Sequence, residues 1–440
     1  MFELNEEQNT ALKAMLSGAN CFITGEAGTG KTTVIRDYLK RTKRNAVIVA
    51  PTGVAALNAG GVTIHSFFRL PCTVVEYGEL EPLRSKDKKQ KRLIRATDVI
   101  VIDEISMVRS DIFSAIDTRL RQVCDGSKPF GGKQLIVSGD FFQLPPFATT
   151  KEERKYIDAA FGGLFAFQCS EWREAGFETF FFKTIHRQAS DPLFAKLLAA
   201  VRKRDFSSLF EVGGKQVTAI DALNLFVCNK PNAKAISLCT TRAVAAKLNT
   251  DSAAAVHSTP VMFTAKIQGD FPVDRYPTDE GLELKVGERV MALANNYDGR
   301  GLVYCNGDLG TIKEIKDKVV VVSFDSGVTT VVSAFEWKTY SYSLHEYSTG
   351  KLSIEPRETG SFEQIPLRLA YATTIHKCQG LSLSHAHIVL GRGCFAAGQM
   401  YTALSRVRTL CGLSVERAVR EKDFFFSEAV VDFYRKLEEK

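Results

Sequence analysis

The chain has 440 residues, of which 45% are hydrophobic and 24% charged, with a formal net charge of +7. Its length predicts two to four domains at roughly 150 residues per domain, and its composition is that of a globular protein. It contains no run of about 18 apolar residues, no signal peptide at its acidic N-terminus and no paired metal-binding spacing among its cysteines. We therefore expect a soluble, intracellular protein without membrane contact, and the basic excess permits a polyanionic partner.

The first predicted strand, at 20–24, leads into a glycine-rich loop and a helix that covers 33–39. The loop reads Gly25-Glu26-Ala27-Gly28-Thr29-Gly30-Lys31-Thr32, which is the spacing of a loop that wraps around nucleotide phosphates. Its glycines let backbone N–H groups point into one concavity, and the following helix adds its positive end. We predict that the loop binds a nucleoside triphosphate, with Lys31 at the β- and γ-phosphates and Thr32 at a Mg²⁺ ion.

Continuous apolar runs predict buried parallel strands at 46–50, 99–102, 134–138, 235–239 and 387–390. Helical patterns lie between them, which indicates doubly wound α/β sheets in two groups, before about residue 178 and after about residue 230. Short strands separated by Gly, Asp and Asn at 286–356 predict a small β-barrel inserted into the second group. The densest basic run, at 84–95, fits either a solvated surface loop or a polyanion contact.

Two carboxylates follow the strand at 99–102 directly, where the ends of parallel strands form ligand sites. Asp103 is placed to hold Mg²⁺ through water, and Glu104 to orient and deprotonate an attacking water. Gln143 follows the strand at 134–138. It either touches the γ-phosphate or is an ordinary polar residue of a proline-rich turn.

Together these segments resemble the Pif-type helicases of superfamily 1, type B, which are related to RecD and Dda. The matching motifs are spread over nearly the whole chain, at 51–56, 63–67, 103–107, 128–136, 139–146, 186–188, 239–242, 372–380 and 401–406. The resemblance implies two tandem RecA-like domains, the first at 1–70 and 97–178 and the second at 179–295 and 363–440. It also implies a pin or wedge insertion at 71–96 and an SH3-like barrel at 296–362.

The resemblance further assigns roles to single residues. Arg187 and Arg406 would reach from the second domain to the charge that builds on the γ-phosphate; without the resemblance they read as surface ion-pair residues. Gln8 would recognise adenine, or else be an exposed amide, while Gln379 and Gly380 would relay the state of the γ-phosphate. The residues expected to touch a single strand are Thr52, His65, Thr374 and His376, although either histidine could instead shape the cleft between the domains.

The function implied is an ATP- and Mg²⁺-dependent DNA helicase that moves 5′ to 3′ on single-stranded DNA and unwinds forked or 5′-tailed duplexes. The family's roles lie in replication, repair, recombination or telomere maintenance, and G-quadruplexes and RNA:DNA hybrids are further candidate substrates. We take a monomer as the default. The other function classes are an ATP-gated nucleic-acid clamp, disfavoured by Glu104, Arg187 and Arg406, and a small-molecule phosphotransferase, disfavoured by the two tandem α/β domains.

Overall fold

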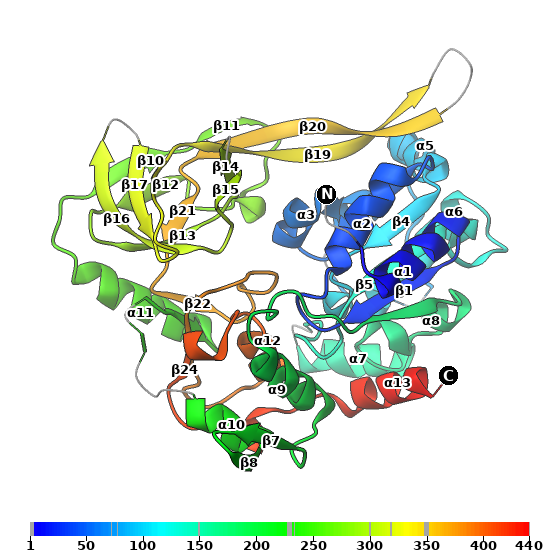
Figure 1. Cartoon of the computed structure of the whole chain (residues 1–440). Helices are drawn as coiled ribbons and strands as arrows, with labels where there is room; N and C mark the ends of the chain where they lie inside the picture. Colours follow the sequence, from blue (N-terminus) through cyan, green and yellow to red (C-terminus); the bar gives the residue numbers. More distant parts are fainter. Residues whose placement is uncertain are drawn as a thin grey trace.

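The computed structural model describes residues 4–439 except 72, 77, 148–149, 227–230, 233, 299–300, 317–318 and 347–351. Two α/β parts, each built on a parallel sheet, lie side by side, and an antiparallel part adjoins the second (Figure 1). The predicted α/β fold is therefore confirmed. Within the described residues, no helix has both the length and the apolar character needed to cross a bilayer.

The first sheet has six parallel strands in the order β3-β2-β4-β5-β1-β6. They are β1 (Cys21–Gly25), β2 (Ala46–Ala50), β3 (Val62–Thr63), β4 (Val99–Ile102), β5 (Gln134–Gly139) and β6 (Glu178–Phe182). β1, β4 and β5 are buried along their whole length, as continuous apolar runs predict for strands covered on both faces. Because β6 pairs with β1, this sheet extends to Phe182, past the predicted boundary at 178.

The helices of the first part are α1 (Glu6–Ser17), α2 (Lys31–Arg41), α3 (Gly53–Ala59), α4 (Ile64–Phe68), α5 (Lys88–Ala96), α6 (Ser110–Val123), α7 (Lys151–Phe161) and α8 (Ser170–Glu174). Four of them, α1, α3, α4 and α7, begin at a side-chain N-cap. Asn5 and Gln8 form a capping box at α1. The basic run at 84–95 is mostly α5 rather than a loop: Leu93 and Ile94 are buried while most of its Lys and Arg side chains are exposed, which makes it the charged face of an amphipathic helix.

The second sheet has four parallel strands in the order β22-β9-β23-β24. They are β9 (Ile236–Cys239), β22 (Ala372–Thr374), β23 (Ala386–Val389) and β24 (Leu413–Val415). The helices of this part are α9 (Pro192–Lys203), α10 (Ala219–Phe226), α11 (Arg242–Ala254) and α12 (Gln399–Leu404), with a hairpin of β7 (Leu209–Val212) and β8 (Lys215–Thr218).

The antiparallel part is inserted between β9 and β22 of the second sheet. Its strands are β10 (Val261–Thr264), β11 (Lys266–Gly269), β12 (Gly281–Leu284), β13 (Arg289–Ala292), β14 (Asn296–Asp298), β15 (Gly301–Tyr304), β16 (Leu309–Lys316), β17 (Val319–Phe324), β18 (Thr329–Val332), β19 (Phe335–Glu346), β20 (Leu352–Gln364) and β21 (Leu367–Leu369). Five of them form the sheet β18-β17-β16-β13-β21 over a separate apolar core. Since β13 and β21 belong to this sheet, it extends beyond the predicted limits of 296 and 362.

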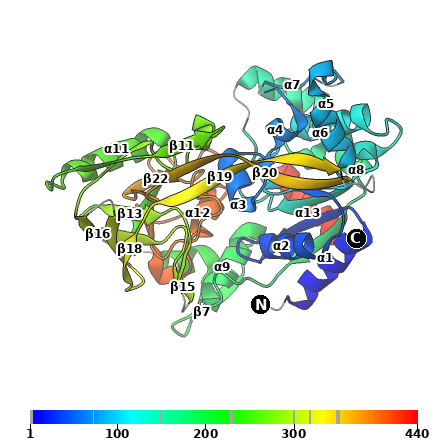
Figure 2. The same cartoon turned by 90° about the horizontal axis from the view of Figure 1, so that it is seen from above.

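A long hairpin of β19 and β20, which we call the arm, crosses from the antiparallel part to the first part (Figures 1 and 2). There the backbone N–H of Ile48 donates to the Tyr342 hydroxyl at 2.9 Å, and the N–H of Ile354 donates to Asn45 Oδ1 at 3.1 Å. The Tyr342 ring also packs edge-on against Phe67, with centroids 6.0 Å apart. The arm thus connects the antiparallel part directly to the first part.

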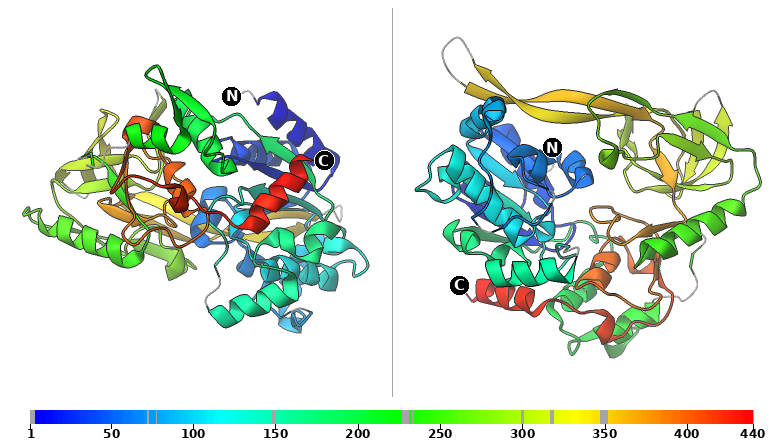
Figure 3. Two further views of the ribbon diagram at one scale, coloured as in Figure 1. Left: turned by 90° about the horizontal axis from the view of Figure 1, so that it is seen from below. Right: turned by 180° about the vertical axis from the view of Figure 1, so that it is seen from behind.

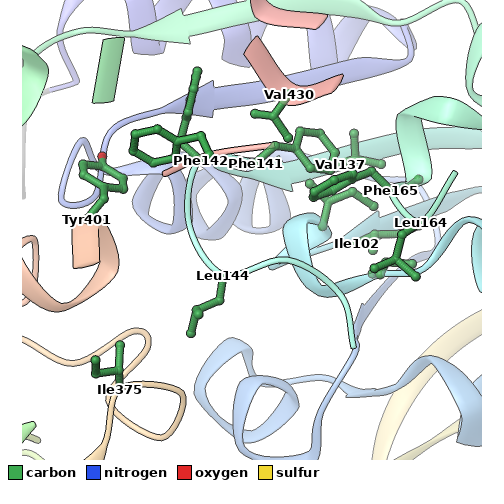
Figure 4. Packing of buried hydrophobic residues seen from close by; sticks show 14 of the residues in the cluster. Ile102, Val137, Phe141, Phe142, Leu144, Leu164, Phe165, Ile375, Tyr401 and Val430 are labelled. Carbon is green, nitrogen blue, oxygen red and sulfur yellow. The ribbon is translucent and has the colours of Figure 1, made fainter. Parts of the chain in front are cut away.

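The C-terminal helix α13 (Glu428–Glu438), which the sequence had grouped with the second part, packs its aromatic residues on the first part, while Glu428 and Tyr434 also contact α9 (Figure 3). Its Phe433 ring stacks on Phe167 at 4.1 Å and lies 5.7 Å from Phe141. Figure 4 shows Phe141 and Phe142 packed with Phe165 and with Val430 of this helix. The physical reason is that the amphipathic face of α13 completes an aromatic cluster which the helices of the first part leave open.

Candidate active site

A cavity of about 470 Å³ lies between the two α/β parts. Thirteen of the predicted site residues line it: Gln8, Ala27, Gly28, Thr29, Gly30, Lys31, Thr32, Asp103, Glu104, Gln143, Arg187, Gly380 and Arg406. Gly25, Glu26 and Gln379 do not line it. Glu26 and Gln379 directly precede lining residues, and the Gly25 carbonyl accepts a hydrogen bond from Lys31. The residues brought together come from distant segments of the chain, as expected for a site at the carboxyl ends of parallel strands.

The phosphate loop is already curled around its lysine. Lys31 Nζ donates to the carbonyl oxygens of Gly25 and Glu26, both at 2.8 Å. Burial lowers the pKa of Lys31 to about 8, although Asp140 and Glu104 act to raise it. Gly28 has φ 83°, and a Cβ there would lie 2.4 Å from Arg187 Cβ, so only glycine lets the second part approach the loop this closely.

The two carboxylates lie at the end of β4 and share a buried environment. Glu104 has φ 54° in the left-handed region, which is uncommon outside glycine and is found at functional sites. Burial raises the pKa of both Asp103 and Glu104, and the charge of Asp103 raises that of Glu104 further. A carboxylate with a raised pKa is a stronger base, which suits Glu104 to accept a proton from water.

The donor set fits a Mg²⁺ ion shared with phosphates. Thr32 supplies a hydroxyl and Asp103 a carboxylate, and both line the cavity. Among the described residues, no group of three or more His, Cys, Asp or Glu side chains could hold a metal without outside ligands. A site with only two protein oxygen donors is typical of Mg²⁺, because this ion keeps several waters and takes substrate phosphates as its other ligands.

Two buried arginines face the loop from the second part. Arg187 Nη1 donates to the Ser405 carbonyl at 3.0 Å, and Arg406 Nε donates to the Thr402 carbonyl at 3.0 Å. Within the described residues, neither guanidinium has a hydrogen bond or ion pair to a carboxylate. Burial and repulsion from Arg406 lower the pKa of Arg187 to about 9. Cations in a cavity that no carboxylate pairs directly favour an anionic ligand between them.

Two contacts cross the cavity directly. Arg406 Nη2 donates to Gln143 Oε1 at 3.5 Å, and Gln379 Nε2 donates to Glu104 Oε2 at 3.2 Å. Gln143 thus meets an arginine of the other part, and its contact with the γ-phosphate stays a prediction. Gln379 touches the carboxylate that we assign to the attacking water.

Gln8 is buried rather than exposed, with 4% of its surface accessible. Its Oε1 accepts from the Asn5 N–H at 3.1 Å, and its Nε2 donates to the Thr29 carbonyl at 3.1 Å. The side chain thus supports the phosphate loop from α1. Adenine recognition by Gln8 stays a prediction.

The cavity also contains residues to which sequence reasoning gave no role, among them Asp140, His186 and Ser382. Asp140 and His186 lie in the matching motifs at 139–146 and 186–188, which also contain the predicted site residues Gln143 and Arg187. The family motifs could therefore have indicated both. The His186 N–H donates to the Gly28 carbonyl at 2.9 Å. Ser382 has no local signal, because its place depends on how the loop after Gly380 folds.

The predicted strand contacts lie as two pairs at the carboxyl ends of the two sheets. Thr52 is the N-cap of α3, where its Oγ1 accepts from the Ala55 N–H at 3.2 Å, and His65 lies in α4. Thr374 ends β22, and the His376 ring stacks on Phe395 with centroids 6.1 Å apart. Burial lowers the pKa of both histidines, so they are neutral at pH 7 and suited to packing rather than to ion pairing.

Comparisons with known proteins agree with this geometry. A family model described as PIF1-like helicase matches residues 3–213. The human ATP-dependent DNA helicase PIF1 is 33% identical over 94% of this chain, which spans 60% of that protein's length.

Solved structures of a bacterial relative cover the whole chain. The Bacteroides sp. Pif1 complex with ADP-AlF4 matches with a TM-score of 0.87 and 33% identity, covering 100% of this chain and 98% of the relative. The same relative bound to single-stranded DNA matches at 34% identity and the same coverage, but with a TM-score of 0.68. This chain therefore belongs to the PIF1-like helicase family.

Proposed function

We propose that this chain is an ATP-dependent DNA helicase that translocates 5′ to 3′ on single-stranded DNA and unwinds duplexes. The observation that carries the proposal is the composition of the cavity. A phosphate loop, a carboxylate pair and Gln143 from the first part meet two arginines from the second part, and those arginines lack a carboxylate partner among the described residues.

Each side chain then has a defined role in hydrolysis. Lys31 and the N–H groups of the loop bind the β- and γ-phosphates. Thr32 and Asp103 would hold Mg²⁺, which would neutralise phosphate charge when bound. Glu104 takes the proton of the attacking water, and Arg187 and Arg406 stabilise the charge that develops on the γ-phosphate.

Hydrolysis requires the two parts to be closed, because the arginines belong to one part and the phosphate loop to the other. A single loop connects the proposed DNA contact to the site of hydrolysis. Residues 375–380 carry His376, a proposed strand contact, and Gln379, which donates to Glu104. A shift of this loop on the strand therefore moves the partner of the catalytic carboxylate.

The relatives support the substrate class. The human relative is named an ATP-dependent DNA helicase, and Bacteroides sp. Pif1 was solved with single-stranded DNA. Because this chain spans 60% of the human protein, the helicase activity, its 5′ to 3′ polarity and the use of forked DNA are proposals for it. So are the pin or wedge at 71–96, the SH3-like character of the antiparallel part, the DNA contacts of Thr52, His65, Thr374 and His376, and action as a monomer.

The decisive experiment compares unwinding of duplexes that carry only a 5′ tail or only a 3′ tail, with ATPase measured with and without oligonucleotide. We expect strong stimulation of ATPase and unwinding of the 5′-tailed duplex alone. An ATP-gated clamp would bind both substrates without unwinding either, and a phosphotransferase would be indifferent to oligonucleotide. Duplexes of RNA with DNA and folded G-quadruplexes, each with a 5′ tail, extend the same assay to the remaining candidate substrates.

A further inference from the structure

Behind the cavity, a buried ion pair joins the two α/β parts. Arg202, on α9, donates through Nη2 to Asp140 Oδ1 at 3.1 Å and through Nε to the same oxygen at 3.3 Å. Asp140 is 1% exposed and Arg202 7%. Burial alone would lower the pKa of Arg202, but the charge of Asp140 raises it, so the arginine stays charged.

Two aromatic rings lie beside the guanidinium of Arg202. Its central carbon lies 4.6 Å from the centroid of the Phe142 ring and 4.9 Å from that of Tyr434. Those two rings are themselves stacked, with centroids 4.8 Å apart. This cation–π arrangement leaves Arg202 little freedom to change its direction.

Asp140 shapes the loop that carries Gln143. Its Oδ1 accepts from the Phe142 N–H at 3.2 Å, and its carbonyl accepts from the Gln143 N–H at 3.0 Å. Asp140 itself lines the cavity. The carboxylate that pairs with Arg202 therefore also fixes the backbone next to a predicted γ-phosphate contact.

A third partner comes from α12. The Tyr401 hydroxyl donates to Asp140 Oδ2 at 3.2 Å. Burial, followed by the charge of Asp140, raises the pKa of Tyr401 well above its usual value, which keeps it a neutral donor. Figure 4 shows Tyr401 at one end of the packed rings, beside Phe142.

Helix α12 leads from Tyr401 straight to Arg406. The Ser405 N–H donates to the Tyr401 carbonyl at 2.9 Å, and Arg406 Nε donates to the Thr402 carbonyl at 3.0 Å. At the start of α12, a Cβ on Gly398 would lie 2.2 Å from the Phe142 carbonyl oxygen, so this end of the helix touches the Gln143 loop. The direction of Arg406 thus depends on where α12 rests on that loop.

We propose that Asp140, Arg202 and Tyr401, which we call the buried joint, position Arg406 against Gln143 and the γ-phosphate. This inference rests on the proposed function. Neither Arg202 nor Tyr401 lines the cavity, so both act only through Asp140, α12 and the Gln143 loop. Its loss therefore affects the rate of hydrolysis more than the binding of ATP, because the phosphate loop keeps its own contacts.

Two tyrosines of equal burial provide a matched test. Tyr401→Phe removes one hydroxyl from the joint. Tyr434→Phe removes one hydroxyl that bonds Thr24 Oγ1 at 2.6 Å and the Phe141 N–H at 3.2 Å, and it leaves the ring beneath Arg202. We expect Tyr401→Phe to lower the kcat of DNA-stimulated ATP hydrolysis about tenfold with the KM for ATP within about twofold, and Tyr434→Phe to lower the melting temperature without this loss of kcat.

A double-mutant cycle shows whether Tyr401 acts through Arg406. In an Arg406→Ala background, Tyr401→Phe should change kcat by less than about twofold. If Tyr401→Phe does not fold, Arg202→Lys serves in its place. It keeps the positive charge but loses the two guanidinium donors to Asp140, and it should show the same loss of kcat. Equal effects of the two tyrosine variants, or a full Tyr401→Phe effect without Arg406, would overturn the joint. Failure of the proposed function is distinct, because the wild-type chain would then lack DNA-stimulated ATPase.

Discussion

Two of the contacts between the halves of this molecule, the buried joint and the arm, differ in kind. At the buried joint, a charged pair lies beside two aromatic rings and none of its three residues is more than 7% exposed. At the arm, two backbone N–H groups donate to Tyr342 and Asn45, and one aromatic pair meets edge-on. The joint is therefore expensive to break, whereas hydrogen bonds of the arm can be exchanged for water at little net cost.

This difference suggests which contact gives way when the parts rearrange. The two Bacteroides sp. Pif1 structures match this chain with equal coverage and nearly equal identity, yet with TM-scores of 0.87 with ADP-AlF4 and 0.68 with single-stranded DNA. The two structures therefore differ from each other, and we infer that their parts are arranged differently. This chain resembles the first arrangement more closely, and we expect its arm, not its joint, to open in the second.

Breaking the joint should have the largest effect. Arg202→Met leaves Asp140 buried without its cation, and we expect the free energy of unfolding to fall by about 3–5 kcal/mol. Arg204→Met is the matched control. That residue is two positions away and pairs with Glu428 of α13 at 2.5 Å, but on the surface, with 42% and 74% of the two side chains exposed. Its loss should cost less than about 1 kcal/mol in the same urea titration, and equal losses would contradict the comparison.

The next largest effect tests whether ATP is hydrolysed in the cavity next to the buried joint. Glu104→Gln should lower the kcat of ATP hydrolysis by about 10²–10⁴-fold, because the amide cannot accept the proton of water. Nucleotide should still bind, since the phosphate loop is unchanged, and a fluorescent ATP analogue measures this.

Glu171→Gln provides the control for Glu104→Gln. This buried glutamate accepts from Ser114 Oγ at 2.7 Å and does not line the cavity. We expect it to affect stability and not kcat. Wild-type turnover in the Glu104→Gln protein would remove Glu104 as the base.

The arm should give a smaller effect of opposite sign. Tyr342→Phe removes the acceptor for the Ile48 N–H and should destabilise the closed arm by about 1 kcal/mol. Single-stranded DNA should then bind roughly fivefold more tightly, because less work is needed to release the arm. Tyr340→Phe, on the same strand, is the control, and fluorescence anisotropy with a labelled oligonucleotide is the readout. Weaker binding by Tyr342→Phe would show that the arm stays closed on DNA.

The sequence was most informative where a function depends on neighbours along the chain. The phosphate loop and the Asp103-Glu104 pair were predictable because spacing alone places them after buried strands. The parallel strands were predictable because continuous apolar runs indicate burial on both faces.

Contacts between distant segments could not be predicted from the sequence alone. Arg202 and Asp140 are 62 positions apart, and Tyr401 and Asp140 are 261 apart. In the sequence, Arg202 is one charge among several at the end of a helix. The same limit explains why the packing of α13 on the aromatic rings of the first part was not predicted and why Gln8 was open to being an exposed amide: each is decided by packing against a segment that local pattern does not reveal.

The smallest effect concerns Glu26, whose charge interacts with the joint from the phosphate loop. Burial raises the pKa of Glu26 from 4.5 to about 7, although Arg202 acts to lower it and Asp140 raises it further. A carboxyl whose pKa is raised on folding binds more protons in the folded state, so stability falls as the pH rises from about 4.5 through about 7 and levels off above that. Glu26→Gln removes this cost, and its stabilisation relative to wild type should grow by about 1 kcal/mol between pH 6 and pH 8. Urea titrations at the two pH values measure the difference. A stabilisation by Glu26→Gln that does not change with pH would mean that water solvates Glu26 and that the buried joint does not exclude water from it.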